Sequence, residues 1–141
     1  MKELPLVFNN NPVSKWEMAL KNGQKPRSIF DEEFYGYGVD GGTGLFIDEK
    51  ANSAFEDSSK RDDDLWSDVF ADKITRTYRN TWESILYNFN GHNLAAFSTG
   101  WGDGYFGTYI GYDSKGEICR LLTDFDMIDW RKHTSKSTEN K

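Results

Sequence analysis

The sequence has a single cysteine, and this scarcity limits the chemistry open to the chain. Cys119 stands alone among 141 residues, so no intramolecular disulfide and no cysteine-based zinc site can form. Cys119 also falls on the apolar side of a predicted strand, which is typical of a buried, unreactive thiol. The sequence therefore predicts a fold that depends on its apolar core rather than on covalent cross-links.

Long apolar runs are missing as well. No window approaches the roughly 18 apolar residues that a membrane-spanning helix needs. The opening Met1–Pro5 has no apolar run after its charges, so no signal peptide is expected. Together with the scarcity of cysteine, these absences predict a cytoplasmic protein with no membrane partner.

Basic clusters are also scarce. The chain carries 17 Lys and Arg against 23 Asp and Glu, a formal net charge of −6. Because nucleic-acid binding relies on basic clusters that face phosphates, nucleic acid is not an expected partner. Acidic residues are densest over Asp48–Asp72. We interpret this stretch as a solvated surface that keeps the protein soluble, the alternative being a surface for a basic protein partner.

Aromatic residues and glycines, in contrast, are abundant. Aromatics make up 16% of the chain, which also has 13 glycines. Rings suit the half-buried face of a sheet, and many glycines indicate tight turns rather than a helical bundle. We predict an α+β fold with a mostly antiparallel sheet, for which a sandwich is one arrangement. The length fits a single β-rich domain over residues 1–130, followed by a polar, disordered tail over 131–141.

Strand signals are clearest in the C-terminal third. There the sequence predicts an antiparallel meander with strands over 94–97, 105–112 and 117–125. Asp113–Gly116 has the composition of a tight turn between the last two strands. A further strand is expected over 13–20, where Trp16, Met18 and Leu20 alternate with other residues.

Two or three short helices are expected between Asp48 and Asn90. Asp48 is a typical N-cap for the first of these helices, and Asp62–Asp64 is typical of the start of a second. Residues 80–89 fit two patterns, since their apolar residues fall on one helical face but also alternate as in a strand. We favour a helix there, ended by Asn90-Gly91.

Two glycine-rich loops resemble each other and form a candidate ligand site. Residues 36–41 read Gly-Tyr-Gly-Val-Asp-Gly, and residues 100–104 read Gly-Trp-Gly-Asp-Gly. Glycine lets a backbone approach a ligand, an aspartate can bind a cation or fix a turn, and an exposed ring offers a stacking surface. The alternative, which turn chemistry alone favours, is a pair of ordinary turns whose rings lie in the core. The candidates are Tyr37, Asp40, Trp101 and Asp103.

Other kinds of site have weaker support. Asp40 and Asp103 are weak metal candidates, because loop carboxylates can assemble an oxygen-rich site for Ca²⁺ or Mg²⁺. Gly36, Gly38 and Gly41 have the spacing of a dinucleotide fingerprint, but no buried strand precedes them and no helix follows directly. We therefore reject a dinucleotide site, and the sequence leaves the cofactor unknown.

No pattern of residues predicts catalysis. The only histidines are His92, beside a turn, and His133, in the expected tail. Neither is flanked by a nucleophile elbow, so no Ser-His-acid arrangement is evident. We assign no catalytic residue.

Several ordered blocks resemble the family named domain of unknown function 4241. The blocks are VSKWEMA at 13–19, FYGYGVDGGTG at 34–44, FSTGWGDGY at 97–105, YIGYD at 109–113 and TDF at 123–125. The resemblance implies a shared fold and carries no assigned activity. Because members often have more sequence before the first block, it also implies that the chain corresponds to the later part of the domain. Thr43, Gly44 and Tyr105 join the ligand-binding candidates because they fall within these blocks.

The sequence leaves two functions open. The favoured one is a small acidic binding or interaction protein without catalytic activity, acting on a protein partner, for which an immunity or accessory protein is one concrete form. The alternative is a metal- or small-ligand-dependent enzyme that uses the Asp40 and Asp103 loops, with Trp101 as a stacking platform.

Overall fold

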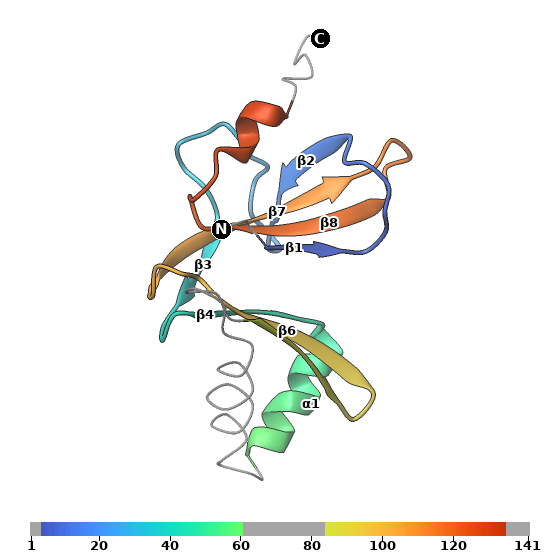
Figure 1. Ribbon diagram of the computed structural model, residues 1–141, viewed down its shortest axis with the longest axis vertical. Coiled ribbons are helices and arrows are strands. Elements are labelled where there is room, and N and C mark those ends of the chain that lie inside the picture. Colours follow the sequence, from blue (N-terminus) through green and yellow to red (C-terminus); the bar gives the residue numbers. More distant parts are fainter. Residues whose placement is uncertain (1–3, 61–83, 135–141) are drawn as a thin grey trace. The chain divides into compact units, whose positions relative to one another are not determined.

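The computed structural model describes residues 4–60 and 84–134, and in it the chain divides into two compact units (Figure 1). Unit 1 comprises residues 1–38 and 105–141, and unit 2 comprises residues 39–104. Each unit contains an antiparallel sheet. The mostly antiparallel architecture is thereby confirmed, whereas the single domain over 1–130 and the sandwich stay predictions.

Unit 1 is built on a sheet with the strand order β1-β8-β7-β2, in which β3 also pairs with β7 (Figure 1). The predicted meander is confirmed in its last two strands, since β7 and β8 form an antiparallel hairpin. The strands are β1 (Leu4–Val7), β2 (Lys15–Met18), β3 (Gly36–Val39), β7 (Gly104–Tyr112) and β8 (Ile118–Asp124).

Aromatic rings fill the core of unit 1. Trp130 packs edge-on against Tyr109 and Trp16, with ring centroids 5.0 and 5.2 Å away. Met18 and Leu122 complete the buried cluster. Such ring pairs contribute about 1 kcal/mol each beyond their buried area, so the many aromatics of the sequence supply the cohesion that aliphatic residues supply elsewhere.

The 3-10 helix η2 (Trp130–His133) follows β8 and carries Trp130 into this core. The polar tail expected over residues 131–141 overlaps η2. Arg131 is half-buried here, whereas residues 135–141 lie outside the described residues.

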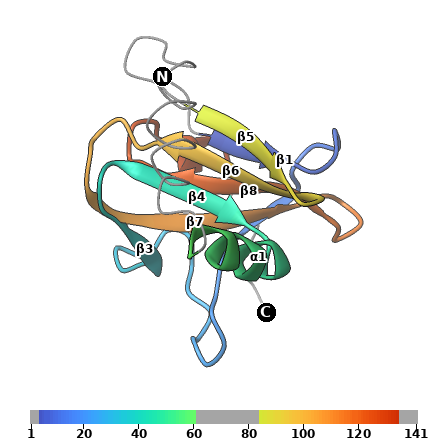
Figure 2. The same cartoon turned by 90° about the horizontal axis from the view of Figure 1, so that it is seen from below.

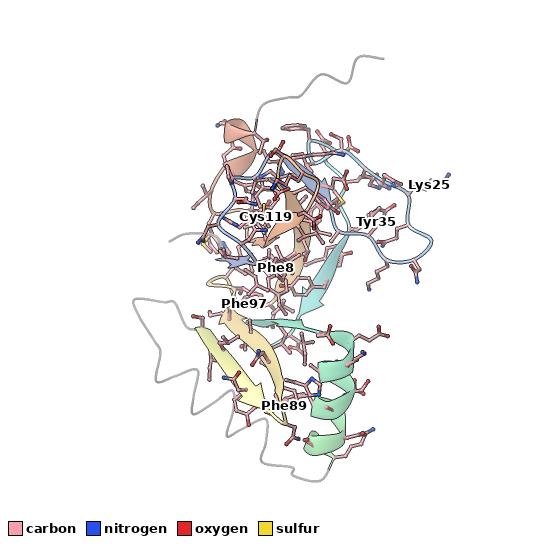
Figure 3. The ribbon with its side chains drawn as sticks, turned by 90° about the vertical axis from the view of Figure 1, so that its right-hand side faces the viewer. Phe8, Lys25, Tyr35, Phe89, Phe97 and Cys119 are labelled. Carbon is pink, nitrogen blue, oxygen red and sulfur yellow. The ribbon has the colours of Figure 1, made fainter. Side chains whose placement is uncertain are left out.

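Unit 2 is a three-stranded antiparallel sheet, in the order β4-β6-β5, packed against the helix α1 (Figure 2). Phe55 of α1 is buried with Leu94 and Ala96 of β6, which alternate along the strand and so share one face. Phe89 lies beside α1 in Figure 3, with its ring 5.5 Å from that of Phe55. The elements are β4 (Thr43–Ile47), α1 (Glu49–Ser59), β5 (Ser84–Phe89) and β6 (His92–Ser98).

The predicted first helix is confirmed at α1. The carboxylate of Asp48 accepts a hydrogen bond from the Lys50 amide at 2.9 Å, as an N-cap does. Within the described residues α1 is the one α-helix, rather than the expected two or three. The helix predicted from Asp62 lies outside those residues.

The helix favoured for residues 80–89 is wrong in its described part, where Ser84–Phe89 form β5. Ile85, Tyr87 and Phe89 alternate onto the face that packs against α1, and β5 pairs with β6 through the turn at Asn90-Gly91. Pairing with a neighbouring strand therefore decides between two patterns that the local sequence leaves balanced.

No helix in the described part of the chain is both long enough and apolar enough to cross a membrane.

The turn between β7 and β8 depends on the buried carboxylate of Asp113. It accepts hydrogen bonds from the Asn11 side-chain amide at 2.7 Å and from the backbone amides of Lys115 and Glu117 at 2.8 and 3.0 Å. The Asn11 bond first, and then these backbone bonds, hold the pKa of Asp113 below its ordinary value of 3.8. The carboxylate therefore stabilises the fold above about pH 4, and this contribution is lost as the pH falls through the lowered pKa.

We expect Asp113→Asn to lower the free energy of unfolding at pH 6, because the neutral amide is a weaker acceptor. The difference from the wild type should shrink as the pH falls from 6 to 3, since the wild-type carboxylate becomes protonated. Urea denaturation at each pH measures it. Asn11→Ala, which removes the largest cause of the lowered pKa, should show the same trend. A difference that is constant with pH would contradict this role.

Candidate functional site

Within unit 2, Gly42, which directly follows the glycine-rich stretch 36–41, contacts the second glycine-rich loop at Asp103. The Gly42 amide donates to Oδ1 of Asp103 at 3.0 Å, and the Gly42 carbonyl accepts from the Thr99 amide at 2.9 Å. Gly42 has a φ of +67°, and a Cβ on it would come within 3.2 Å of the Gly102 Cα. Glycine is thus the residue that fits where the loops touch.

Thr99, which sequence reasoning missed, holds the loop around Trp101 by hydrogen bonds to the loop backbone. Its buried hydroxyl donates to the Gly102 carbonyl at 2.6 Å and accepts from the Trp101 amide at 3.3 Å. Short polar side chains commonly satisfy loop backbone in this way. In the sequence, a hydroxyl or carboxylate side chain beside several glycines is the signal that points to a residue that hydrogen-bonds the loop backbone.

The unit 2 candidates differ in what they present to solvent. Asp40 is exposed, and Trp101 is 68% exposed. Asp103 is also exposed, but one of its carboxylate oxygens is engaged by the backbone of Gly42. Thr43 and Gly44 open β4, where Gly44 is buried. The described contacts thus give Asp103 a structural role and leave Trp101 available to a partner.

The other two candidates, Tyr37 and Tyr105, belong to unit 1. The Tyr37 hydroxyl is hydrogen-bonded to the Thr123 hydroxyl at 3.1 Å, and burial raises the pKa of Tyr37. Tyr105 is exposed, its ring stacks on that of Phe34, and its hydroxyl accepts from the Gly36 amide at 2.9 Å. Tyr37 therefore has a structural position, whereas Tyr105 presents an open ring.

No group of three or more His, Cys, Asp or Glu side chains lies close enough to hold a metal ion anywhere in residues 4–60 and 84–134. Metal binding at Asp40 and Asp103 stays a prediction.

Unit 1 contains an open pocket of about 910 Å³ that the sequence did not single out. Its lining comes from three parts of the chain, namely residues 29–34, the first half of β7, and the stretch from the end of β8 through η2. The lining combines aromatic rings with ionised side chains. Pockets of this size with a few converging polar groups are the usual setting of a binding site.

Arg131 joins the three parts of the pocket lining. Its guanidinium pairs with the Asp124 carboxylate at 2.6 Å and donates to the Tyr109 hydroxyl at 2.8 Å, while Nε donates to the Ile29 carbonyl at 2.9 Å. The same group lies over the rings of Tyr109 and Trp130. Burial by itself lowers the pKa of Arg131. The interactions with Tyr109 and Asp124 outweigh burial and raise this pKa above its ordinary value.

The other Asp124 oxygen fixes the chain just after β8. Oδ1 accepts from the Asp126 amide at 2.9 Å, and Asp126 adopts a φ of +55°. This left-handed conformation is costly for a residue with a Cβ, although Asp tolerates it better than most. Asp126 lines the pocket. Its strained backbone conformation therefore places a carboxylate in the pocket lining.

We expect Asp103→Ala to lower the free energy of unfolding by about 1 kcal/mol, because the Gly42 amide loses its acceptor at a partly solvated position. Thermal or urea denaturation of the full chain measures the change. Asp40→Ala, in the neighbouring exposed turn, is the matched control and should change stability by less. Equal effects would show that the bond to Gly42 contributes nothing specific.

A larger effect is expected at Arg131. Arg131→Met keeps the apolar stem but leaves the Asp124 carboxylate, which is 7% exposed, without its cation, and this should cost about 3 kcal/mol. Lys132→Met is the control, because the Lys132–Asp129 pair is on the surface and should contribute about 0.5 kcal/mol or less. If urea denaturation gives both variants similar stabilities, Arg131 does not hold unit 1 together.

Comparison with known protein families gives a match over most of the chain. A family model described as a protein of unknown function, DUF4241, matches residues 3–123. No curated protein and no solved structure matches the chain. The family match covers most of the chain and confirms the resemblance seen in the sequence blocks. The chain belongs to the DUF4241 family.

Proposed function

We propose that this protein is a binding protein without catalytic activity that engages a protein partner through the pocket of unit 1. The observation that carries the proposal is the exposure of large aromatic side chains on the pocket lining, Phe30, Phe34 and Tyr105. Exposed aromatic groups beside a cavity are typical of interaction sites, and aromatic residues are enriched among those that dominate binding energy.

The aromatic surface is held in place before any partner binds. The rings of Phe34 and Tyr105 stack with centroids 5.8 Å apart, and the Tyr105 hydroxyl is anchored on the Gly36 amide. A Cβ on Gly36 would come within 2.3 Å of the Phe106 carbonyl oxygen, so the backbone beneath the rings is tightly packed. A rigid surface loses little conformational entropy on binding, which favours affinity.

Charge supports a basic partner. Five carboxylates line the pocket against the two cations Arg131 and Lys132, and the whole chain has a net charge of −6. Complementary charge steers association and selects among partners. A small acidic protein that occupies a basic partner, such as an immunity or accessory protein in the cytoplasm, is one concrete form of this function.

The second candidate is a metal- or small-ligand-dependent enzyme that uses the Asp40 and Asp103 loops of unit 2, with Trp101 as a stacking platform. It is favoured by the contact between the loops at Gly42 and Asp103, and by the exposed ring of Trp101. A thermal-shift panel of divalent metals, nucleotides and sugars separates the two functions. A shift that Asp103→Ala abolishes would support the loops as a site.

We expect a random peptide library displayed on phage to yield peptides that bind the wild-type protein through the pocket. Binding of the selected peptides should fall at least tenfold in Phe34→Ala and Tyr105→Ala, because each variant removes an exposed ring. Calorimetry or fluorescence titration measures the affinity.

Phe8→Ala is the matched control for this test. Phe8 and Tyr105 are each 57% exposed in unit 1, and Phe8 does not line the pocket. Each variant is first compared with the wild type in thermal unfolding, so that loss of fold is not mistaken for loss of binding. Peptides that bind the pocket variants as tightly as they bind the wild type would refute the proposed function.

A further inference from the structure

Unit 1 repeats one arrangement, in which an arginine lies over an aromatic ring and pairs with a carboxylate. Arg131 lies 5.1 Å from the centre of the Tyr109 ring and pairs with Asp124. Arg27 lies 5.0 Å from the centre of the Tyr35 ring and pairs with Glu33. Tyr35 is labelled in Figure 3 on the chain leading into β3. In both cases this chain supplies the arginine, the ring and the carboxylate, so each arrangement is complete without a partner.

The pocket lining also has rings and carboxylates that pair with no arginine among the residues that the structure describes. The stacked rings of Phe34 and Tyr105 share the lining with the carboxylates of Asp31, Glu32 and Asp126. None of these three acids is ion-paired with another residue in ranges 4–60 and 84–134. One Asp31 oxygen accepts from the Ser28 amide at 3.1 Å, which leaves its negative charge in place.

The two cations of the lining are already engaged. Arg131 pairs with Asp124 at 2.6 Å, and Lys132 pairs with Asp129 at 2.7 Å. Asp31, Glu32 and Asp126 therefore add three negative charges to the lining that have no counterion in the part of the chain that the structure describes. This excess of negative charge attracts a cationic group to the pocket.

We propose that the pocket takes the guanidinium group of an arginine side chain on a basic segment of the partner protein, an inference that rests on the proposed function. The planar guanidinium stacks on the Phe34–Tyr105 rings while the carboxylates of Asp31, Glu32 and Asp126 accept its N–H groups. Arginine is favoured over lysine because its planar group stacks on rings, binds carboxylates in a fork and is less strongly hydrated.

The test uses three short capped peptides that differ at one position. Acetyl-glycyl-X-glycinamide, with X as arginine, lysine or citrulline, is titrated into the ¹⁵N-labelled full-length protein and followed by two-dimensional NMR. Citrulline keeps the shape of arginine and removes its charge. We expect millimolar binding of the arginine peptide, about threefold weaker binding of lysine, and at least about tenfold weaker binding of citrulline.

Variants of the lining then locate the binding. Phe34→Leu should weaken the arginine peptide about fivefold because it removes a ring, whereas Phe34→Tyr should retain the affinity. Asp126→Gly should also weaken it, and it should fold well because a φ of +55° suits glycine. Phe8→Leu is the control outside the pocket and should bind as the wild type does.

The outcomes separate this inference from the proposed function. Equal binding of citrulline and arginine peptides, or arginine binding that Phe34→Leu and Asp126→Gly leave unchanged, would overturn the arginine assignment. If phage-selected peptides without arginine still bind in a manner that depends on Phe34 and Tyr105, the proposed function stands and only the arginine assignment fails. If those peptides do not depend on the pocket either, both fail.

Discussion

The ion pair between Arg131 and Asp124 is the interaction on which unit 1 depends. A carboxylate as buried as Asp124 is costly unless a cation and hydrogen bonds compensate it, and Arg131 supplies that compensation while its remaining donors reach Tyr109 and Ile29. These contacts fasten η2 to β7, to the end of β8 and to the chain near residue 29. The pocket lining is assembled from the same segments, so the ion pair holds the walls of the pocket in place.

Unit 2 uses polar side chains differently, to satisfy the backbone of its loops. Gly42 donates to Asp103 and accepts from the Thr99 amide, while the Thr99 hydroxyl bonds the loop around Trp101. Backbone groups in a turn need partners, and short polar side chains nearby provide them. Asp103, one of the two loop aspartates that the sequence offered as ligands, is thus engaged in holding two loops together, and Trp101 near it is exposed.

The two kinds of aromatic residue in unit 1 explain how a chain with a mean hydropathy of −0.74 forms a core and also exposes rings to solvent. Tyr109 and Trp130 are buried against each other and beneath the guanidinium of Arg131, where they supply cohesion. Phe34 and Tyr105 are stacked but exposed, and they share the pocket lining with acids that form no ion pair within the described residues. Burial thus separates rings that stabilise the fold from rings that are available to a partner.

Local signals were enough to predict the N-cap at Asp48, the turn at Asp113–Gly116 and the antiparallel pair of strands around it, because each depends on neighbouring residues. They failed over residues 84–89, where helical and strand patterns coexist and pairing with β6 decides the outcome. The pocket could not be predicted, because the bond from Arg131 to Ile29 spans 102 residues and no local pattern joins them. Sequence alone determined the composition of rings and acids, and only the tertiary structure decided which of them share one surface.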